Sequence, residues 1–171
     1  MTKRAAIPSR ETIEALLIYN RDAGLFVWRV QRGPRKAGEV AGGFDKDGYR
    51  RIKIGARQPL ASHLVWMMEH GELPPHDLDH HDLNRSNDRI GNLRPATRRQ
   101  NIANTGLRST NTSGHKGVYF CRQSKLWRAR IRVAVGAKTQ KHLGSFNTAA
   151  EAGVAYANAA REMYGEFARV K

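Results

Sequence analysis

Four polar residues in the middle of the chain have the types that phosphodiester hydrolysis requires. Asp79 and His80 are adjacent, and two amides, Asn92 and Asn101, follow them. Oxygen ligands from Asp and Asn suit a hard divalent cation, and an imidazole can take a proton from water near neutral pH. Hydrolysis needs both a base that makes the nucleophile and a cation that neutralises developing charge. The four residues therefore predict a hydrolytic site with one divalent cation, Mg²⁺ or Mn²⁺.

The net charge indicates an anionic partner. The sequence has 30 Lys and Arg residues against 15 Asp and Glu residues, so its formal net charge is +15 at pH 7. Because such an excess repels itself in the folded state, an anion usually accounts for it. Nucleic acid is the first candidate and an acidic membrane surface is the second. The sequence contains no apolar run of about 18 residues, so we expect no segment that spans a bilayer.

The charge is distributed unevenly along the chain. Residues 106–171 hold 12 basic and 3 acidic side chains, whereas residues 1–105 hold 18 basic and 12 acidic side chains. The acids therefore concentrate in the part where a cation would need them. The almost purely basic end predicts a module that binds nucleic acid.

Cysteine usage and length set the broad class. The single cysteine, Cys121, excludes an intramolecular disulfide and argues against a cysteine-based zinc site. Residues 1–12 contain no apolar stretch of the signal-peptide kind. We therefore expect a monomer in a reducing cytoplasm. With 171 residues and 40% hydrophobic content, the chain suits one or two small domains.

The first part of the chain is predicted to be rich in β-structure. Residues 12–19 favour a short helix, and alternating apolar residues from Leu25 favour a strand. A second strand is expected over 49–54. An aromatic beside alternating cations suits a surface that follows a nucleic-acid backbone, although a solvated sheet face is an equal alternative. The outward residues of this strand are Tyr49, Arg51 and Lys53.

The segment that carries the polar residues is predicted to form a helix, two short strands and a second helix. Residues 60–70 are compact and apolar, and a glycine ends them. Two short strands with a polar turn between them follow. Thr97 and Gln100 have the spacing of a capping box, so the second helix begins near Arg98. Asn101 then lies in its first turn.

The remainder of the chain predicts a sheet packed on one helix. Residues 105–115 are polar and rich in Ser, Thr, Asn and Gly, which is typical of a flexible linker. The fold class is therefore α+β. Strands are expected over 117–121, 126–133 and 140–146, and a helix over 148–164. The expected parts are a β-rich DNA-contacting part over 1–58, the chemical core over 59–104, the linker over 105–115 and the basic module over 116–171.

The segment WRARIRV is the clearest amphipathic strand in the sequence. Its apolar residues point one way, and Arg128, Arg130 and Arg132 point the other. Three arginines spaced about 7 Å apart on a sheet face do not belong to a core. They suit phosphates or guanine edges in a major groove.

Residues 63–101, HLVWMMEHGELPPHDLDHHDLNRSNDRIGNLRPATRRQN, resemble the HNH homing-endonuclease motif of phage and intron enzymes. The markers are the Asp79-His80 pair, the element from Asp88 to Leu93, and Asn101. The resemblance implies a ββα-metal finger, in which a hairpin and then a helix hold one cation. The preceding segments GLFVWRV and DGYRRIKI also resemble the usual N-terminal part of such enzymes.

Carried over residue by residue, this resemblance implies four roles. Asp79 would bind the metal, and His80 would be the general base. Asn92 would brace the hairpin or orient the imidazole, and Asn101 would be the second metal ligand. Adjacent side chains of a regular strand face opposite ways, so Asp79 and His80 share a site only where the strand is irregular or ends.

The sequence departs from this motif at two places. Ser62-His63 stand where the family commonly has His-Arg, which alters a phosphate contact. His81 stands where an aliphatic residue is frequent, and it places a rival base beside His80. Arg98 and Arg99 at the start of a helix oppose its macrodipole, and a bound phosphate or simple solvation would remove that penalty.

Residues 113–170 resemble an Apetala-two/ethylene-response-factor DNA-binding domain. The matching features are KGV, the K-x-W-x-A-x-I pattern, HLGSF, the alanine-rich segment AEAGVAYANAA and YGEFA. The resemblance implies a three-stranded antiparallel sheet laid in the major groove of DNA and backed by one helix. Tyr119 and Cys121 stand where arginines are usual on the first strand, so base specificity is not carried over. The alternative is a generic basic domain that binds RNA or nonspecific DNA.

Together these observations predict a DNA endonuclease, homing-endonuclease-like and encoded by a phage or mobile element. It would nick or cut double-stranded DNA near a recognised site. The alternative is a non-catalytic DNA-binding transcriptional regulator with a degenerate HNH core, and a third interpretation, an RNA-binding protein, rests on charge alone. The predicted DNA-contacting residues are Arg51, Lys53, Arg94, Arg98, Arg99, Lys116, Tyr119, Arg128, Arg130, Arg132 and His142.

Overall fold

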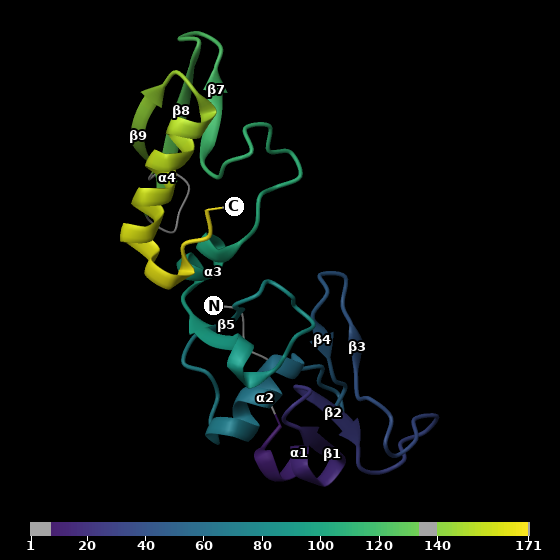
Figure 1. The fold of residues 1–171 in the computed structure, drawn as a ribbon. Helices are drawn as coiled ribbons and strands as arrows, with labels where there is room; N and C mark the ends of the chain where they lie inside the picture. Colours follow the sequence, from purple (N-terminus) through teal and green to yellow (C-terminus); the bar gives the residue numbers. More distant parts are fainter. Residues whose placement is uncertain (1–7, 134–139, 171) are drawn as a thin grey trace. The chain divides into compact units, whose positions relative to one another are not determined.

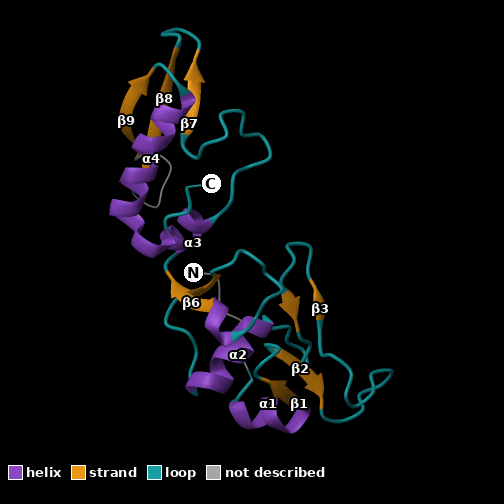
Figure 2. Cartoon of the chain, in the orientation of Figure 1, coloured by secondary structure: helices purple, strands orange, loops and turns teal. Residues whose placement is uncertain are grey.

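The chain divides between Pro95 and Ala96 into two units, each with its own hydrophobic core. The structure, a computed structural model, describes residues 8–133 and 140–170. Figure 1 follows the chain through both units, and Figure 2 separates helices, strands and loops. The sequence analysis places the boundary at 105–115 instead. The helix that follows the second short strand therefore belongs to the second unit.

The first unit combines helices with three two-stranded antiparallel sheets. The sheets pair β1 with β2, β3 with β4, and β5 with β6. The elements are α1 (Arg10–Leu16), β1 (Leu17–Asn20), β2 (Leu25–Trp28), β3 (Gly43–Phe44), β4 (Arg50–Arg51), α2 (Ala61–His70), β5 (Asp77–His80), the 3₁₀ turn η1 (Ile90–Asn92) and β6 (Leu93–Ala96), whose last residue opens the second unit.

The core of the first unit lies between α2 and the strand β2. Phe26 and Trp28 of β2 are buried, as are Leu64 and Val65 of α2. The predicted helix 60–70 is confirmed as Ala61–His70, and Gly71 ends it in the left-handed conformation with φ 75°. That conformation is one that glycine adopts without steric cost.

The predicted helix over 12–19 is wrong in its second half. The helix α1 ends at Leu16, and Leu17 begins β1, where it pairs with Trp28 of β2. Leu17 is buried and Ile18 is exposed, which is the alternation of a strand. The apolar run LLIY is compatible with a helix or a strand, and the pairing with β2 decides between them.

The second unit packs one long helix on a three-stranded antiparallel sheet with the order β7-β8-β9. This arrangement confirms the predicted α+β class. Figure 2 shows α4 lying along the sheet. The elements are α3 (Arg98–Asn104), β7 (Val118–Cys121), β8 (Leu126–Arg132), β9 (Gln140–Phe146), α4 (Ala149–Tyr164) and the 3₁₀ turn η2 (Gly165–Phe167).

Local sequence signals position both helices of the second unit. Thr97 and Gln100 form the predicted capping box at the start of α3, and Thr148 and Glu151 form the one at the start of α4. Each box satisfies backbone N–H groups that the first turn leaves without a partner. Tyr156 of α4 is buried against the sheet.

The segment predicted as a linker makes several hydrogen bonds within the second unit. Ser113 Oγ donates to the carbonyl of Val118 at 3.0 Å, and Asn111 Nδ2 donates to that of His115 at 2.9 Å. An added Cβ at Gly153 of α4 would meet the His115 ring, so the small glycine allows this loop to approach the helix. Among the described residues, no helix is both long and apolar enough to cross a bilayer.

We expect Gly24→Ala to destabilise the first unit strongly. Gly24 is buried with φ 65°, and an added Cβ would collide with the backbone of Asp88 and Arg89. The free energy of unfolding should fall by about 2–4 kcal/mol, measured by urea denaturation. Gly33→Ala is the control, because Gly33 has φ 57° with open space around it and should lose only about 1–2 kcal/mol. Equal losses for the two variants would show that Gly24 has no tight contact.

Candidate active site

The predicted catalytic pair stands at the end of β5. Asp79 and His80 are both 5% exposed, and β5 ends at His80. The next residues turn sharply, since the backbone N–H of Leu83 donates to the carbonyl of His80 at 3.0 Å. The strand thus ends at the place where the sequence analysis required it to end if the two residues share a site.

His80 is paired with a carboxylate that the sequence analysis did not single out. His80 Nε2 lies 2.9 Å from Asp88 Oδ1, and the side chains are 4% and 2% exposed. Because an ionised carboxylate can only accept, Nε2 carries the proton in this pair. In a neutral ring, Nδ1 is then the nitrogen that can take a proton. Asp88 therefore orients the imidazole and selects its tautomer.

Asn92 holds the loop that delivers Asp88. Its Nδ2 donates to Asp82 Oδ1 at 2.9 Å and to the carbonyl of Asn87 at 2.8 Å. Its Oδ1 accepts from the backbone N–H of Asp82 at 3.0 Å. The sequence predicts that Asn92 either braces the hairpin or orients the imidazole, and these contacts are those of a brace. The contact that orients the imidazole comes from Asp88.

The electrostatics of Asp82 match this bracing role. Burial raises the pKa of Asp82, but hydrogen bonds from Asn87, from the backbone of Asn84 and from Asn92 outweigh it, so the pKa lies below its ordinary value. The carboxylate is therefore ionised at neutral pH and acts as the acceptor that closes the loop.

Asp79 is bound by an arginine. Arg94 of β6 donates from Nε at 3.0 Å and from Nη2 at 2.9 Å to the same oxygen, Asp79 Oδ2. The side chains are 14% and 6% exposed. The guanidinium places a positive charge beside this largely buried carboxylate, where burial of an unpaired charge would be costly. A predicted DNA contact and a predicted metal ligand are thus paired with each other.

The donor set fits a hard divalent cation. The predicted ligands are a carboxylate and an amide oxygen, which suit Mg²⁺ or Mn²⁺ and not softer metals. Within residues 8–133 and 140–170, no three His, Cys, Asp or Glu side chains gather in a way that could hold a metal. A site with few protein ligands is usual for Mg²⁺, which keeps several waters.

Tyr49 and Arg85 continue the site toward the surface. The Tyr49 ring lies 5.8 Å from the His80 ring, and the Arg85 guanidinium lies 4.9 Å from the Tyr49 ring. The predicted outward residues Arg51 and Lys53 are both exposed. Arg51 Nε also donates to Asp45 Oδ2 at 2.8 Å.

Asn101 lies in the first turn of α3, as the sequence predicts, but in the second unit. It is half-buried, and its backbone N–H donates to the carbonyl of Thr97 at 3.0 Å. The two predicted metal ligands therefore belong to different units, and their sharing of one ion stays a prediction. Arg98 is exposed, and the Arg99 guanidinium lies 5.2 Å from the Tyr164 ring.

The predicted arginine face exists on the sheet of the second unit. The strand partners are Tyr119 with Arg128, and Arg130 with His142, so these side chains share one face. The Arg130 guanidinium lies 4.6 Å from the Tyr119 ring. Ala129 and Ile131 are buried on the other face, beneath α4.

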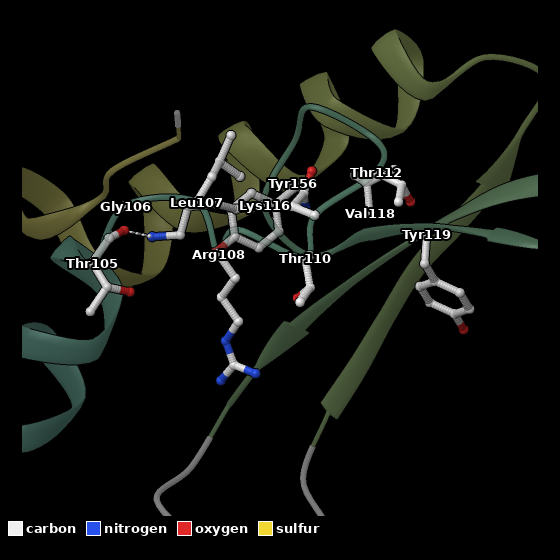
Figure 3. A pocket seen from close by; sticks show the side chains of 12 residues that line it. Thr105, Gly106, Leu107, Arg108, Thr110, Thr112, Lys116, Val118, Tyr119 and Tyr156 are labelled. Atoms are coloured by element: carbon white, nitrogen blue, oxygen red, sulfur yellow. Dashed lines mark hydrogen bonds between the residues drawn. The ribbon is translucent and has the colours of Figure 1, made fainter.

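Lys116 is held inside the second unit. It lines a cavity of about 320 Å³ together with Tyr156. Figure 3 shows these side chains, with the hydrogen bond from Lys116 to Thr105 drawn. Its Nζ donates to the carbonyls of Ala103 at 2.6 Å and Thr105 at 2.7 Å. Burial, and then the charge of Arg169, lower the pKa of Lys116 to about 8. These contacts join the end of α3 to the start of the sheet, and a DNA contact by Lys116 stays a prediction.

Comparison with known proteins agrees with this site. Residues 60–103 match the family described as HNH endonuclease. The chain is also 32% identical over 108 residues to Protein 3.8 of Escherichia phage T7, over 63% of this chain and 86% of that protein. The chain therefore belongs to the same family as Protein 3.8 and contains an HNH endonuclease segment. No solved structure matches it.

The HNH segment begins at α2 and includes β5, the braced loop, β6 and α3. It therefore contains Asp79, His80 and Asp88, together with the contacts described above. The matched residues end at 103, so the resemblance of residues 113–170 to an Apetala-two/ethylene-response-factor domain lies outside the HNH segment and stays a prediction.

We expect nitrogen NMR of the full chain to show His80 protonated at Nε2, because Asp88 can only accept at that position. In Asp88→Asn, the amide can donate instead, and the tautomer protonated at Nδ1 should gain population. Asp22→Asn is the control, since Asp22 is exposed and accepts from Arg89 Nε through its backbone carbonyl and not through its side chain. A His80 tautomer that does not change in Asp88→Asn would contradict the orienting role.

Proposed function

We propose that this protein is a metal-dependent endonuclease that hydrolyses phosphodiester bonds of double-stranded DNA, either by nicking or by cutting both strands near a recognised site. The observation that carries the proposal is the buried His80–Asp88 pair at the end of β5, inside a segment that matches HNH endonucleases. A histidine held by a carboxylate in one tautomer is an arrangement suited to a general base.

Each residue has a defined task in this proposal. His80 takes a proton from the attacking water at Nδ1 while Asp88 holds Nε2–H. Asp79 and Asn101 would be the protein ligands of the cation, and Asn92 keeps the loop closed. When bound, Mg²⁺ or Mn²⁺ supplies charge stabilisation for the phosphate and the leaving oxygen.

We expect the purified chain to nick supercoiled plasmid in Mg²⁺ or Mn²⁺ and to stop when a chelator is added. His80→Ala should cut at least about 100-fold more slowly, because a general base contributes about that much or more. His81→Ala is the matched control: His81 is an exposed neighbour and should keep most of the activity. Gel quantification of relaxed plasmid measures both rates.

The outcomes of this assay separate the alternatives. Loss of cutting in His81→Ala with retention in His80→Ala would move the base to His81. Tight plasmid binding by the wild-type chain without cutting in any metal would support the DNA-binding regulator, which is the second candidate. The sheet face with Arg128 and Arg130 is the specific feature that favours that candidate.

The sheet of the second unit is proposed as the main DNA-binding surface. Its exposed face carries Arg130, which lies over the Tyr119 ring, and Arg132. Residues 106–171 hold 12 basic against 3 acidic side chains. Such a face neutralises phosphates and releases counterions, so its binding depends on salt. A homing-like recognition of one site remains part of this proposal.

We expect the double variant Arg130→Gln and Arg132→Gln to bind duplex DNA more weakly and to lower the slope of log affinity against log salt by about 1 for each lost phosphate contact. Arg161→Gln is the matched control, because Arg161 is an exposed arginine on α4. Fluorescence anisotropy over a range of salt concentrations gives both quantities. An unchanged slope in the double variant would mean that the sheet face does not contact phosphates.

A further inference from the structure

A shallow hollow of about 380 Å³ opens on the first unit beside the catalytic hairpin. It lies between the β3–β4 turn and the loop that follows His80. Its volume is within the range of small-molecule sites, about 300–1,000 Å³. The residues that line it are Phe44, Asp47, Gly48, Leu83, Asn84, Arg85 and Ser86.

Phe44 gives the hollow an exposed aromatic wall. Its side chain is 57% exposed, although burying it would be favourable. The Arg50 guanidinium lies 4.5 Å from the ring centroid, and Arg50 is not among the residues that line the hollow. An exposed aromatic ring beside a cation is the arrangement on which nucleobases stack.

The turn that presents Phe44 is rigid without any ligand. The Asp45 carboxylate accepts from the backbone N–H groups of Asp47 and Tyr49, each at 3.0 Å, and from Arg51 Nε at 2.8 Å. The hydrogen bond from Arg51 is the largest cause that holds the pKa of Asp45 below its ordinary value. A prearranged wall loses little conformational entropy when a base stacks on it.

The opposite wall is held in an unfavourable backbone conformation. Leu83 has φ 65°, in the left-handed region that side chains other than those of Gly, Asn and Asp rarely adopt. Its N–H donates to the carbonyl of His80, which fixes the turn. Strain of this kind persists where surrounding contacts enforce it, and it is frequent at functional sites.

Arg85 and Tyr49 connect the hollow to His80. Arg85 Nη1 donates to the carbonyl of Asp47 at 2.7 Å and so joins the two walls. The same guanidinium lies over Tyr49, whose ring neighbours that of His80. A nucleotide in the hollow would therefore lie close, along the DNA strand, to the phosphate that is attacked at His80.

We propose that this hollow is a nucleobase site, which takes the base of a nucleotide near the scissile phosphate, stacks it on Phe44 and thereby sets where the strand lies relative to His80. The inference rests on the proposed endonuclease function. A nucleic acid is favoured over a protein partner because Arg50 lies against the Phe44 ring, Arg85 lines the hollow and the whole chain has a charge of +15. A base that leaves a duplex must unstack, so a single strand should enter more readily.

Photo-crosslinking tests the site without any cutting. The full chain is mixed, with a chelator present, with a short duplex in which 5-iodouracil replaces thymine, and in a second arm with the separated strands. Irradiation followed by mass spectrometry locates the crosslinked residue. We expect the peptide that contains Phe44 to be labelled, and more strongly by the single strands. Crosslinks confined to other peptides in both arms would overturn the inference.

Substitutions give a second, independent readout. Phe44→Leu keeps an apolar side chain but removes the stacking surface, and it should lower kcat/KM for nicking about 10-fold and broaden the nick positions mapped by sequencing. Phe44→Trp should keep both the kcat/KM and the nick positions of the wild-type chain, because it retains an aromatic surface. Val154→Ala is the control, since Val154 is an apolar side chain that is 60% exposed on α4 of the second unit, outside the sheet. Thermal denaturation checks that each variant is folded.

Failure of this inference is distinguishable from failure of the proposed function. If the wild-type chain never nicks DNA but Phe44 is crosslinked, the base site stands and the endonuclease proposal fails. If the wild-type chain nicks DNA while Phe44→Leu keeps its rate and nick positions, the endonuclease proposal stands and the base site is rejected.

Discussion

One buried contact organises the HNH segment of this protein: the pairing of the His80 imidazole with the Asp88 carboxylate. Both side chains are almost fully buried, so each would pay a large desolvation cost without the other. The surrounding structure serves to bring them together. Asn92 closes the intervening loop through Asp82 and Asn87, and the turn at Gly24 packs against the backbone of Asp88. The match of residues 60–103 to HNH endonucleases gives this geometry its chemical interpretation, since a histidine held in one tautomer is suited to take a proton from water.

The same loop connects the buried pair to the surface. Beyond His80 the chain turns through the strained Leu83 to Arg85, which is bonded to the β3–β4 turn and lies over Tyr49. The hairpin β3–β4 is short, and its turn is fixed by hydrogen bonds to Asp45 and not by burial. It can therefore present Phe44 to solvent without losing its shape. Rigid presentation of exposed groups is what a surface needs if it is to place a flexible polymer accurately.

Local sequence signals predicted much of this fold. Each of these signals is contained in a short stretch of sequence, and each element forms where its pattern indicates. They are the capping boxes at Thr97 and Thr148, the apolar segment 60–70 and the alternation of β8. The error over 12–19 has a definite cause. An apolar run without clear periodicity suits a helix or a strand. Residues 17–20 form the strand β1 because they pair with β2, which lies outside that run. The placement of α3 in the second unit likewise depends on contacts such as that of Lys116 with Ala103, which no local pattern records.

The amino-acid sequence defines the available chemistry: a carboxylate and an imidazole side by side, amides after them, an excess of cations and a resemblance to HNH enzymes that the family match supports. Folding selects the partner of each of these groups. It pairs His80 with Asp88, Asp79 with Arg94, and Asn92 with the loop it braces. Residue types and their spacing indicate which chemistry a side chain can perform, because this information lies in the residue itself and its neighbours along the chain. Which groups meet depends on how burial closes loops around a core, and that free energy belongs to the folded unit as a whole.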